Sequence, residues 1–236
     1  MKSANLLKSL KLNTLISGEP GTGRHTLARL IMPDAVLLHG DDPDLFQRIE
    51  KNPQLIIDRF EAVEHYPKLF QSLRKHGGHI VAIADGGMED SIGASFSVRI
   101  VLPPLKERPE DIPPLLEKFR SEMAQFFGEK GMESFEIDRE RLDVSQNAFS
   151  LRKSIMLQYI ASRIQEQELM DMTEKFLSKH MESQEEIYRK MLYLYEVPLI
   201  RAGFKRYKSQ LKMSQVFGLN RNTLRKKINE WQFFLK

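Results

Sequence analysis

Short apolar runs alternate with amphipathic stretches through the first part of the chain, and this alternation constrains the fold more than any other feature. In the stretches RHTLARLIM and YPKLFQSLRKHG the apolar residues recur every three or four positions, as in a helix that covers one face of a sheet. Strands that alternate with such helices are typical of a parallel α/β sheet. We therefore predict an α/β core with strands at TLIS (14–17), AVLLH (35–39), LIID (55–58), HIVAIAD (79–85) and SVRIVL (97–102).

The pattern becomes helical after Leu102. A helix is predicted from Pro109 to about Phe127, the glycine-containing stretch 128–131 ends it, and further helix is expected from Arg139 to about Met172. We interpret these helices as a small lid on the core. The charged stretch 166–186 contains no Gly or Pro, so we expect a helical connector there. The expected domains are the α/β core at 1–132, the lid and connector at 133–180, and a C-terminal domain at 181–236.

A glycine-rich segment, Gly18-Glu-Pro-Gly-Thr-Gly23, joins the first predicted strand to the first predicted helix, which is the context that a phosphate-binding loop requires. Its glycines allow backbone N–H groups to point inward, and the positive end of the helix attracts phosphate. Arg24 stands where a lysine normally reaches the terminal phosphates, and its wide guanidinium is a poorer point charge. Two interpretations stay open: a phosphate site of altered affinity, or a turn that serves only the fold. The candidate nucleotide-binding residues here are Gly18, Gly21, Thr22, Gly23, Arg24 and His25.

Asp58 ends the apolar run Leu55–Ile57, and in a P-loop ATPase the acid at the end of such a strand holds magnesium. We therefore predict that Asp58 is the magnesium ligand if a nucleotide binds. The next acid of an ATPase polarises the attacking water, but this chain has Arg59 there, and a cation cannot accept a proton from water at neutral pH. Unless Glu61 or Glu64 supplies that base, we expect ATP hydrolysis to be lost or very weak.

These segments resemble the NtrC-like bacterial enhancer-binding proteins, activators of sigma-54 RNA polymerase that combine an AAA+ ATPase with a Fis-type helix-turn-helix. SGEPGTGRHTLARL is similar to their phosphate loop, LIIDRF to their Asp-Glu strand, and VLPPLKERPEDIPPLLEKF (101–119) to their Pro-Pro-Leu-Arg-Glu-Arg-x-x-Asp-Ile signature. The resemblance covers nearly the whole chain and implies a site for ATP or ADP with Mg²⁺. It also implies that Asp85 and Arg152 occupy the first and second sensor positions of that site.

Two features of the family are missing from the core. The family's Gly-Ala-Phe-Thr-Gly-Ala loop, which touches the sigma factor, is absent between Gly23 and Asp58. The family also carries arginines that reach the nucleotide of a neighbouring subunit; the remaining candidate here is Arg99, which we expect to lie within a strand. We therefore expect a degenerate AAA+ core that has lost the sigma-54 contact.

The segment from Val197 to Lys236 is strongly basic. It contains ten lysines and arginines and one acid, a net charge of +9, whereas the rest of the chain sums to −5. Its pattern predicts a helix at Gln210–Phe217, a break at Gly218 and a second helix with Asn220 as its N-cap. A mildly acidic body with a compact basic end is typical of a protein that binds nucleic acid.

The second of these helices has distinct faces. Leu219, Leu224 and Ile228 form the stripe that we expect to be buried. GLNRNTLRKKI is similar to the nucleoid protein Fis and its relatives, and this resemblance implies an all-α, Fis-type DNA-binding domain. The implied base contacts come from Asn220, Arg221 and Arg225, and the implied phosphate contacts from Thr223, Lys226 and Lys227. Asn222, which is also expected to face outward, completes the candidate DNA-binding surface.

The helices before this segment imply a partner. In the family they form an antiparallel dimer, and EEIYRKMLYLYEVPLI (185–200) carries apolar residues suited to that contact. The resemblance implies a homodimer that presents two recognition helices to a pseudo-palindromic site in double-stranded DNA. A higher oligomer is a further possibility.

Composition narrows the remaining choices. The absence of cysteine excludes disulfides, thiolate zinc sites and cysteine nucleophiles, and no apolar run approaches the roughly 18 residues of a membrane helix. The N-terminus lacks the apolar block of a secretory signal, so we expect a cytoplasmic protein without membrane contact. The leading hypothesis is a sequence-specific DNA-binding transcriptional regulator. Two alternatives stay open: a functional ATPase that remodels a polymerase or another protein complex, and a Fis-like nucleoid-organising protein.

Overall fold

The structure, a computed structural model, describes residues 7–52, 54–86, 90–128, 135–181 and 186–235. The chain divides into two compact units, Met1–Arg163 and Ile164–Lys236, and each has an apolar core of its own. The expected boundary between residues 132 and 133 lies outside the described residues.

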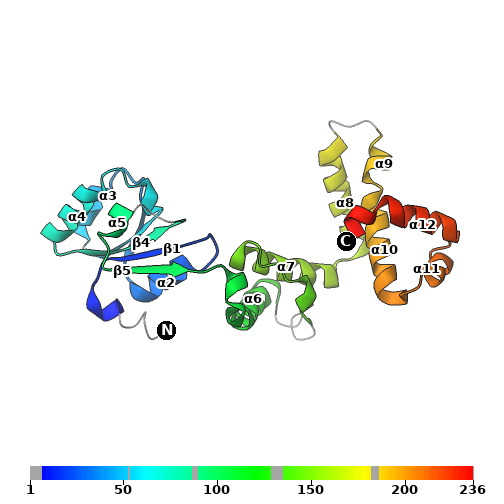
Figure 1. The fold of residues 1–236 in the computed structure, drawn as a ribbon, viewed down its shortest axis with the longest axis horizontal. Helices are drawn as coiled ribbons and strands as arrows, with labels where there is room; N and C mark the ends of the chain where they lie inside the picture. Colours follow the sequence, from blue (N-terminus) through cyan, green and yellow to red (C-terminus); the bar gives the residue numbers. More distant parts are fainter. Residues whose placement is uncertain (1–6, 53, 87–89, 129–134, 182–185, 236) are drawn as a thin grey trace. The chain divides into compact units, whose positions relative to one another are not determined.

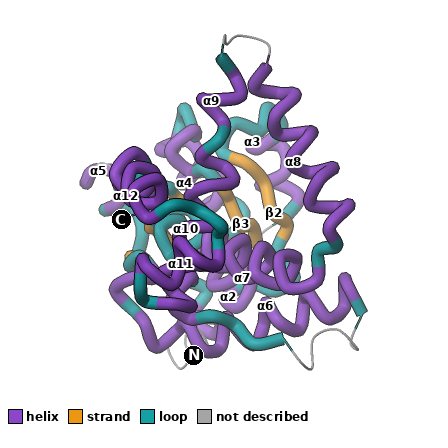
Figure 2. The backbone as a smooth tube through the Cα atoms, turned by 90° about the vertical axis from the view of Figure 1, so that its right-hand side faces the viewer, coloured by secondary structure: helices purple, strands orange, loops and turns teal. Residues whose placement is uncertain are grey.

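A five-stranded parallel sheet forms the centre of the first unit, as the alternation of apolar runs predicted. The strand order is β2-β3-β4-β1-β5, so β1 lies between β4 and β5 and its loop leaves from the interior of the sheet. Figure 2 shows β2 and β3 side by side. The strands are β1 (Thr14–Gly18), β2 (Val36–His39), β3 (Gln54–Asp58), β4 (His79–Ala84) and β5 (Val98–Leu102).

Successive residues of the central strands enter different cores, because side chains of a strand alternate between its two faces. Leu15 packs into the core beneath α3 and α4, whereas Ile16 packs into the core beneath α2. Figure 1 shows α2 on one side of the sheet and α3 and α4 on the other. The helices of this layer are α2 (Arg24–Ile31), α3 (Leu45–Lys51), α4 (Tyr66–Lys75) and the short α5 (Asp90–Gly93).

The lid of the first unit consists of α6 (Ile112–Phe127) and α7 (Asn147–Arg163), which pack through a third apolar cluster. The further helix expected from Arg139 to about Met172 is present only in part and is interrupted. Residues Arg139–Arg141 form a single 3₁₀ turn, and α7 ends before α8 begins at Glu166. The backbone N–H of Gln165 donates to the Glu168 carboxylate at 2.8 Å, which caps the new helix and explains why it starts there.

The second unit is entirely helical in its described residues. A small core of Ile200, Met213 and Leu224 holds its last helices together. A Cβ added to Gly203 would lie 2.5 Å from the Phe217 ring, so α10 and the end of α11 approach closely because that residue has no side chain. The helices are α8 (Glu166–Met181), α9 (Ile187–Met191), α10 (Tyr193–Tyr207), α11 (Gln210–Val216), α12 (Arg221–Glu230) and α13 (Gln232–Leu235).

Across the described ranges, no helix is long and apolar enough to cross a membrane.

Candidate functional site

The glycine-rich loop connects β1 to α2 at the carboxyl edge of the sheet, where parallel α/β proteins bind their ligands. Gly23 is the N-cap residue of α2 and has a φ of 99°. Gly21 has a φ of 81°, a conformation that strongly favours glycine. The Thr22 side chain is buried and its hydroxyl donates to the Glu19 carbonyl oxygen at 2.8 Å, which ties the loop to itself.

The start of the lid helix α7 holds this loop through Asn147, which is 1% exposed. Its amide nitrogen donates to the Glu19 carboxylate and the Pro20 carbonyl oxygen, both at 3.0 Å, and its amide oxygen accepts from Leu105 N–H at 2.6 Å. The next backbone N–H, of Ala148, donates to the Gly21 carbonyl oxygen at 3.2 Å. The sequence reasoning missed Asn147, and its φ of 55° belongs to a tertiary contact that no local pattern reveals.

Arg108 is a second loop contact that the sequence reasoning missed. Its guanidinium donates to the Thr22 carbonyl oxygen at 2.6 Å and to the Pro103 carbonyl oxygen at 3.0 Å, and it pairs with Asp111 at 2.8 Å. Pro103, Arg108 and Asp111 belong to the segment 101–119 that resembles the family signature. That resemblance was the signal that could have identified Arg108. The segment 101–119 therefore binds the glycine-rich loop through the Thr22 carbonyl oxygen.

Arg24 lies at the start of α2, but its side chain turns toward the end of β4. It is 5% exposed, donates to the Ala84 carbonyl oxygen, and forms an ion pair with Asp85 at 2.5 Å. The structure thus brings together the lysine-equivalent cation and the carboxylate predicted at the first sensor position. The guanidinium charge is balanced by this carboxylate, which lowers its attraction for a phosphate.

Asp58 ends β3 and is approached by two imidazoles. His25 Nε2 lies 3.1 Å and His39 Nδ1 lies 3.6 Å from the same oxygen, Asp58 Oδ2. His39 was missed in the sequence although it ends β2, whose last residue pairs directly with Asp58 in the parallel register. The register of the two neighbouring strands therefore places His39 beside Asp58, and His25 reaches the same oxygen from α2.

Arg59, which stands where the family has its second acid, points to a different loop. It has a φ of 50°, in the left-handed region, and its exposed guanidinium pairs with Asp41 at 2.9 Å. Glu61 lies in the 3₁₀ turn Phe60–Ala62 and Glu64 follows it, and both are exposed. The position next to Asp58 therefore carries a cation bound to the loop that follows β2.

Magnesium is the metal that the resemblance in sequence implies, and the residues around Asp58 do not fit it. Mg²⁺ takes oxygen ligands in near-ideal octahedral geometry, whereas Asp58 Oδ2 faces the ring nitrogens of His25 and His39. Within the part of the chain that the structure describes, no group of three or more histidine, aspartate or glutamate side chains could hold a metal ion.

Arg152, predicted at the second sensor position, lies on α7 and is exposed. Its guanidinium pairs with Glu122 of α6 at 3.1 Å. The structure therefore joins Arg152 to the neighbouring lid helix, whereas Arg24 and Asp85 meet at the edge of the sheet.

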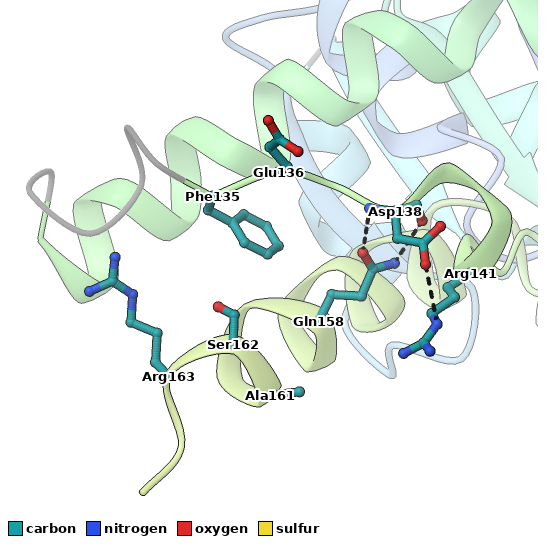
Figure 3. A pocket seen from close by; sticks show the side chains of 8 residues that line it. All are labelled: Phe135, Glu136, Asp138, Arg141, Gln158, Ala161, Ser162 and Arg163. Carbon is teal, nitrogen blue, oxygen red and sulfur yellow. Dashed lines mark hydrogen bonds and ion pairs between the residues drawn. The ribbon is translucent and has the colours of Figure 1, made fainter. Parts of the chain in front are cut away.

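A hollow of about 670 Å³ lies in the lid, between the segment 135–141 and the end of α7. Figure 3 shows Gln158 and Arg141 close to Asp138. Gln158 forms two hydrogen bonds with the Asp138 backbone, at 2.8 and 3.1 Å, and Arg141 pairs with the Asp138 carboxylate at 3.2 Å. These contacts tie the segment to α7 and serve the fold of the lid.

In the second unit, α11 and α12 are joined by a tight turn at the predicted place. Gly218 has a φ of 64°, and the Asn220 side chain accepts from Asn222 N–H at 2.9 Å as the predicted N-cap of α12. Leu224 is buried at 1% exposure, and Leu219 and Ile228 pack partly buried beside it. The remaining residues of the candidate DNA-binding surface that are exposed are Asn220, Arg221, Asn222, Thr223, Arg225 and Lys226.

Lys227 differs from those residues, because its ammonium turns inward and pairs with Glu196 of α10. Glu196 is 7% exposed and also accepts from Trp231 Nε1 at 2.6 Å. The lysine side chain is 27% exposed. The structure thus separates Lys227 from the outward cations of α12 and places it in a contact between α10 and α12.

An apolar groove of about 710 Å³ lies between α8, α9 and α10. Tyr188 and Tyr195 are 76% and 68% exposed at its wall. The residues that line it are Leu169, Thr173, Leu177, Met181, Ile187, Tyr188, Met191, Leu192, Leu194, Tyr195, Pro198 and Leu199.

Comparison with known proteins supports the fold. No protein-family model matches the chain, and no curated protein sequence matches it. The structure of NtrX from Brucella abortus in complex with ATP is similar with a TM-score of 0.53 and 16% sequence identity, over 97% of this chain and 66% of the NtrX chain. The NtrX complex with ADP gives a TM-score of 0.52 and 15% identity over the same shares.

A third NtrX structure from the same organism gives a TM-score of 0.50 and 17% identity, over 98% of this chain and 67% of that one. The chain therefore spans about two thirds of the length of NtrX. The predicted fold class, an α/β core of the AAA+ type followed by helices, is confirmed.

Proposed function

We propose that the chain is a sequence-specific DNA-binding transcriptional regulator whose degenerate AAA+ core binds a nucleotide but turns it over poorly. The observation that carries the proposal is the exposed, cationic start of α12, set against the buried stripe of the same helix. Arg221 is the first residue of the helix, and the first turn contains no acid. A cation at a helix N-terminus opposes the helix dipole, so the arrangement is locally unfavourable and is explained by an anionic ligand.

The shape of α11, the turn and α12 suits a Fis-type helix-turn-helix. The recognition helix of such a motif enters the major groove with its N-terminal residues against base edges. Arg221 can bind guanine in a bidentate manner and Asn222 can bind adenine. Arg225 and Lys226, one turn further on, are placed for phosphate oxygens. Lys227 contributes less to phosphate contacts in this proposal, because Glu196 already neutralises it.

The nucleotide part of the proposal rests on the preserved loop and on the likeness to NtrX, which was solved with ATP and with ADP. Gly21 and Gly23 keep the loop conformation, and the first N–H groups of α2 have no intrahelical partner. Arg59 in place of an acid argues against efficient hydrolysis, because it cannot activate water. ATP turnover at an ordinary AAA+ rate that is lost in Asp58→Asn would favour the ATPase alternative.

We also propose that the apolar groove between α8, α9 and α10 receives a second copy of the chain. The resemblance of residues 185–200 to a dimerising segment supports this choice, and so do the exposed tyrosines on its wall. An apolar surface of this kind is more often an interaction site than solvent-exposed surface. A dimer would place two recognition helices on one DNA site.

Selection of bound fragments from genomic DNA by the full chain tests the DNA-binding proposal. A regulator returns fragments that share a half-site repeat, whereas a nucleoid organiser returns fragments with no common motif. On the selected site, Arg221→Ala should cost about 1–3 kcal/mol, with a smaller loss on random DNA. Lys226→Ala should weaken binding to all sequences alike and lower the salt slope by about one. Equal losses on both DNAs for both variants would contradict these roles.

A further inference from the structure

We infer that the site at the glycine-rich loop binds a nucleoside diphosphate without magnesium, because imidazoles stand at the carboxylate where the metal would bind. The inference rests on the proposed nucleotide binding of the core and names the ligand class of that site. Three observations support it: the contacts of Asp58, the strand register that places His39 beside it, and the position of Arg24.

His25 Nε2 lies 3.1 Å from Asp58 Oδ2, within the distance of an ion pair when the imidazole is protonated. An ionised carboxylate has only acceptor atoms, so a ring nitrogen this close to it favours the form in which Nε2 carries a proton. A ring nitrogen that carries this proton has no lone pair to give to a metal. His25 is also the residue directly after Arg24, at the position of the P-loop Ser/Thr that binds magnesium through its hydroxyl. His25, at the position of the usual hydroxyl ligand, therefore contacts Asp58, at the position of the usual carboxylate ligand.

His39 also lies close to Asp58 Oδ2. Its Cα pairs with that of Asp58 in the register between β2 and β3, and its Nδ1 lies 3.6 Å from Oδ2. Magnesium would need oxygen ligands at about 2.0–2.1 Å and several waters around it. Asp58 is only 16% exposed, and two imidazoles occupy the approaches to the oxygen that would serve as ligand. Asp58 ends the interior strand β3, His39 ends the edge strand β2, and His25 lies in the first turn of α2, with both imidazoles about half exposed.

Arg24 sets the number of phosphates. In a P-loop the backbone N–H groups cradle the α- and β-phosphates, while the cationic side chain and the metal reach the terminal ones. Here the Arg24 guanidinium is buried against Asp85 and the Ala84 carbonyl oxygen. Arg24 is paired with Asp85, and Asp58 faces two imidazoles. The loop can therefore still bind two phosphates through its backbone, but a third phosphate adds little to the affinity. ADP should therefore bind as well as ATP.

Isothermal titration of the full chain with ADP, ATP and AMP, in magnesium and in EDTA, tests the inference. We expect the Kd for ADP to agree within about twofold in the two buffers, ATP to bind within about threefold of ADP, and AMP to bind more than about tenfold more weakly. Magnesium-dependent tightening of about tenfold, or a similar preference for ATP, would overturn the inference and leave nucleotide binding by the core intact. No binding of any nucleotide would overturn both, while DNA binding by α12 is measured separately.

A variant identifies the histidines as the cause. His25→Thr restores the hydroxyl ligand, and combined with His39→Ala it should make ADP binding tighten at least about fivefold in magnesium. His65→Thr, an exposed histidine at the N-cap position of α4 outside the site, is the matched control and should stay independent of magnesium. Unchanged thermal unfolding shows that each variant is folded. A double variant that folds and still ignores magnesium would overturn the role of the imidazoles.

Discussion

Replacing Glu196 with alanine should destabilise the second unit by about 2–3 kcal/mol. The carboxylate accepts hydrogen bonds from Lys227 Nζ and from Trp231 Nε1, so one buried group joins α10 to α12 and to the residue after it. Removing one partner of a buried ion pair costs about 3–5 kcal/mol. The Lys227 side chain is 27% exposed, so water partly screens its charge. The expected cost therefore lies at or below the lower end of that range.

Hydrogen exchange on the full chain, followed by mass spectrometry, measures this loss within the unit. A cost of 2–3 kcal/mol corresponds to exchange that is about 30- to 150-fold faster in α10 and α12. Glu174→Ala, which removes an exposed carboxylate of α8, is the matched control and should leave the exchange of these helices unchanged. If Glu196→Ala also left it unchanged, the argument that this carboxylate holds the two helices together would be refuted.

The same pair predicts a coupling between stability and DNA binding. Lys227→Ala should accelerate exchange in α10 and α12, and should do so less in the Glu196→Ala background, with a coupling energy of about 1–2 kcal/mol. Its effect on the salt slope of DNA binding should be smaller than that of Lys226→Ala, because the Lys227 ammonium faces a carboxylate. Equal salt slopes for the two variants would show that Lys227 leaves Glu196 when DNA binds.

Three further predictions concern the glycine loop, the groove and one histidine. Gly21→Ala should destabilise the first unit by about 1–3 kcal/mol, because the residue has a φ of 81° and an added Cβ would lie 2.9 Å from the Gln146 carbonyl oxygen. The thermal unfolding midpoint should therefore fall. Gly86→Ala is the control and should not lower the midpoint, because a Cβ at Gly86 would have no atom within 4 Å. Tyr195→Glu should convert the dimer to a monomer in sedimentation velocity, whereas Phe233→Glu, 83% exposed outside the groove, should not; a monomeric parent chain would contradict the docking proposal. Burial, with a smaller contribution from Lys11, lowers the pKa of His79 below 6.5, so the unfolded chain binds this proton more readily than the folded one. The free energy of unfolding should therefore fall as the pH drops from about 6.5 toward the lowered pKa, a slope that His79→Gln should reduce in urea titrations at several pH values.

The parallel sheet was predictable because its information is local. Each strand is a short apolar run, and each covering helix has apolar residues at helical spacing, so the period of the pattern decides the element. The lid shows where this reasoning stops. Leu151 and Ile155 lie on a helix that begins only at Asn147, although the sequence favoured helix from Arg139. The start of α7 depends on contacts between Asn147 and the glycine loop, which are remote in sequence.

The glycine-rich loop and Asp58 lie at the ends of the predicted strands, but their contacts were not predictable. Gly18–Gly23 and Asp58 lie at the carboxyl edge of the sheet, as the strand positions required. His39 meets Asp58 because of the order and register of β2 and β3, whereas His25 reaches the same oxygen from α2, and neither contact is a property of one segment. A motif fixes the backbone position of a residue, whereas the partner of its side chain depends on which groups other elements place nearby.

The distribution of acids explains why the two ends of the chain support different conclusions. Arg24, Arg152 and Lys227 were each assigned to an anionic ligand from sequence, and each pairs with a carboxylate of the protein: Asp85, Glu122 and Glu196 respectively. In the first unit such acids are numerous, so a cation in a motif is readily neutralised from within. From Val197 onward the single acid is Glu230, and Lys227 is paired only because α10 supplies Glu196 from just before this segment. The exposed cations of α12 thus lie in a segment with a single acid, and this excess of positive charge supports the proposed binding of DNA.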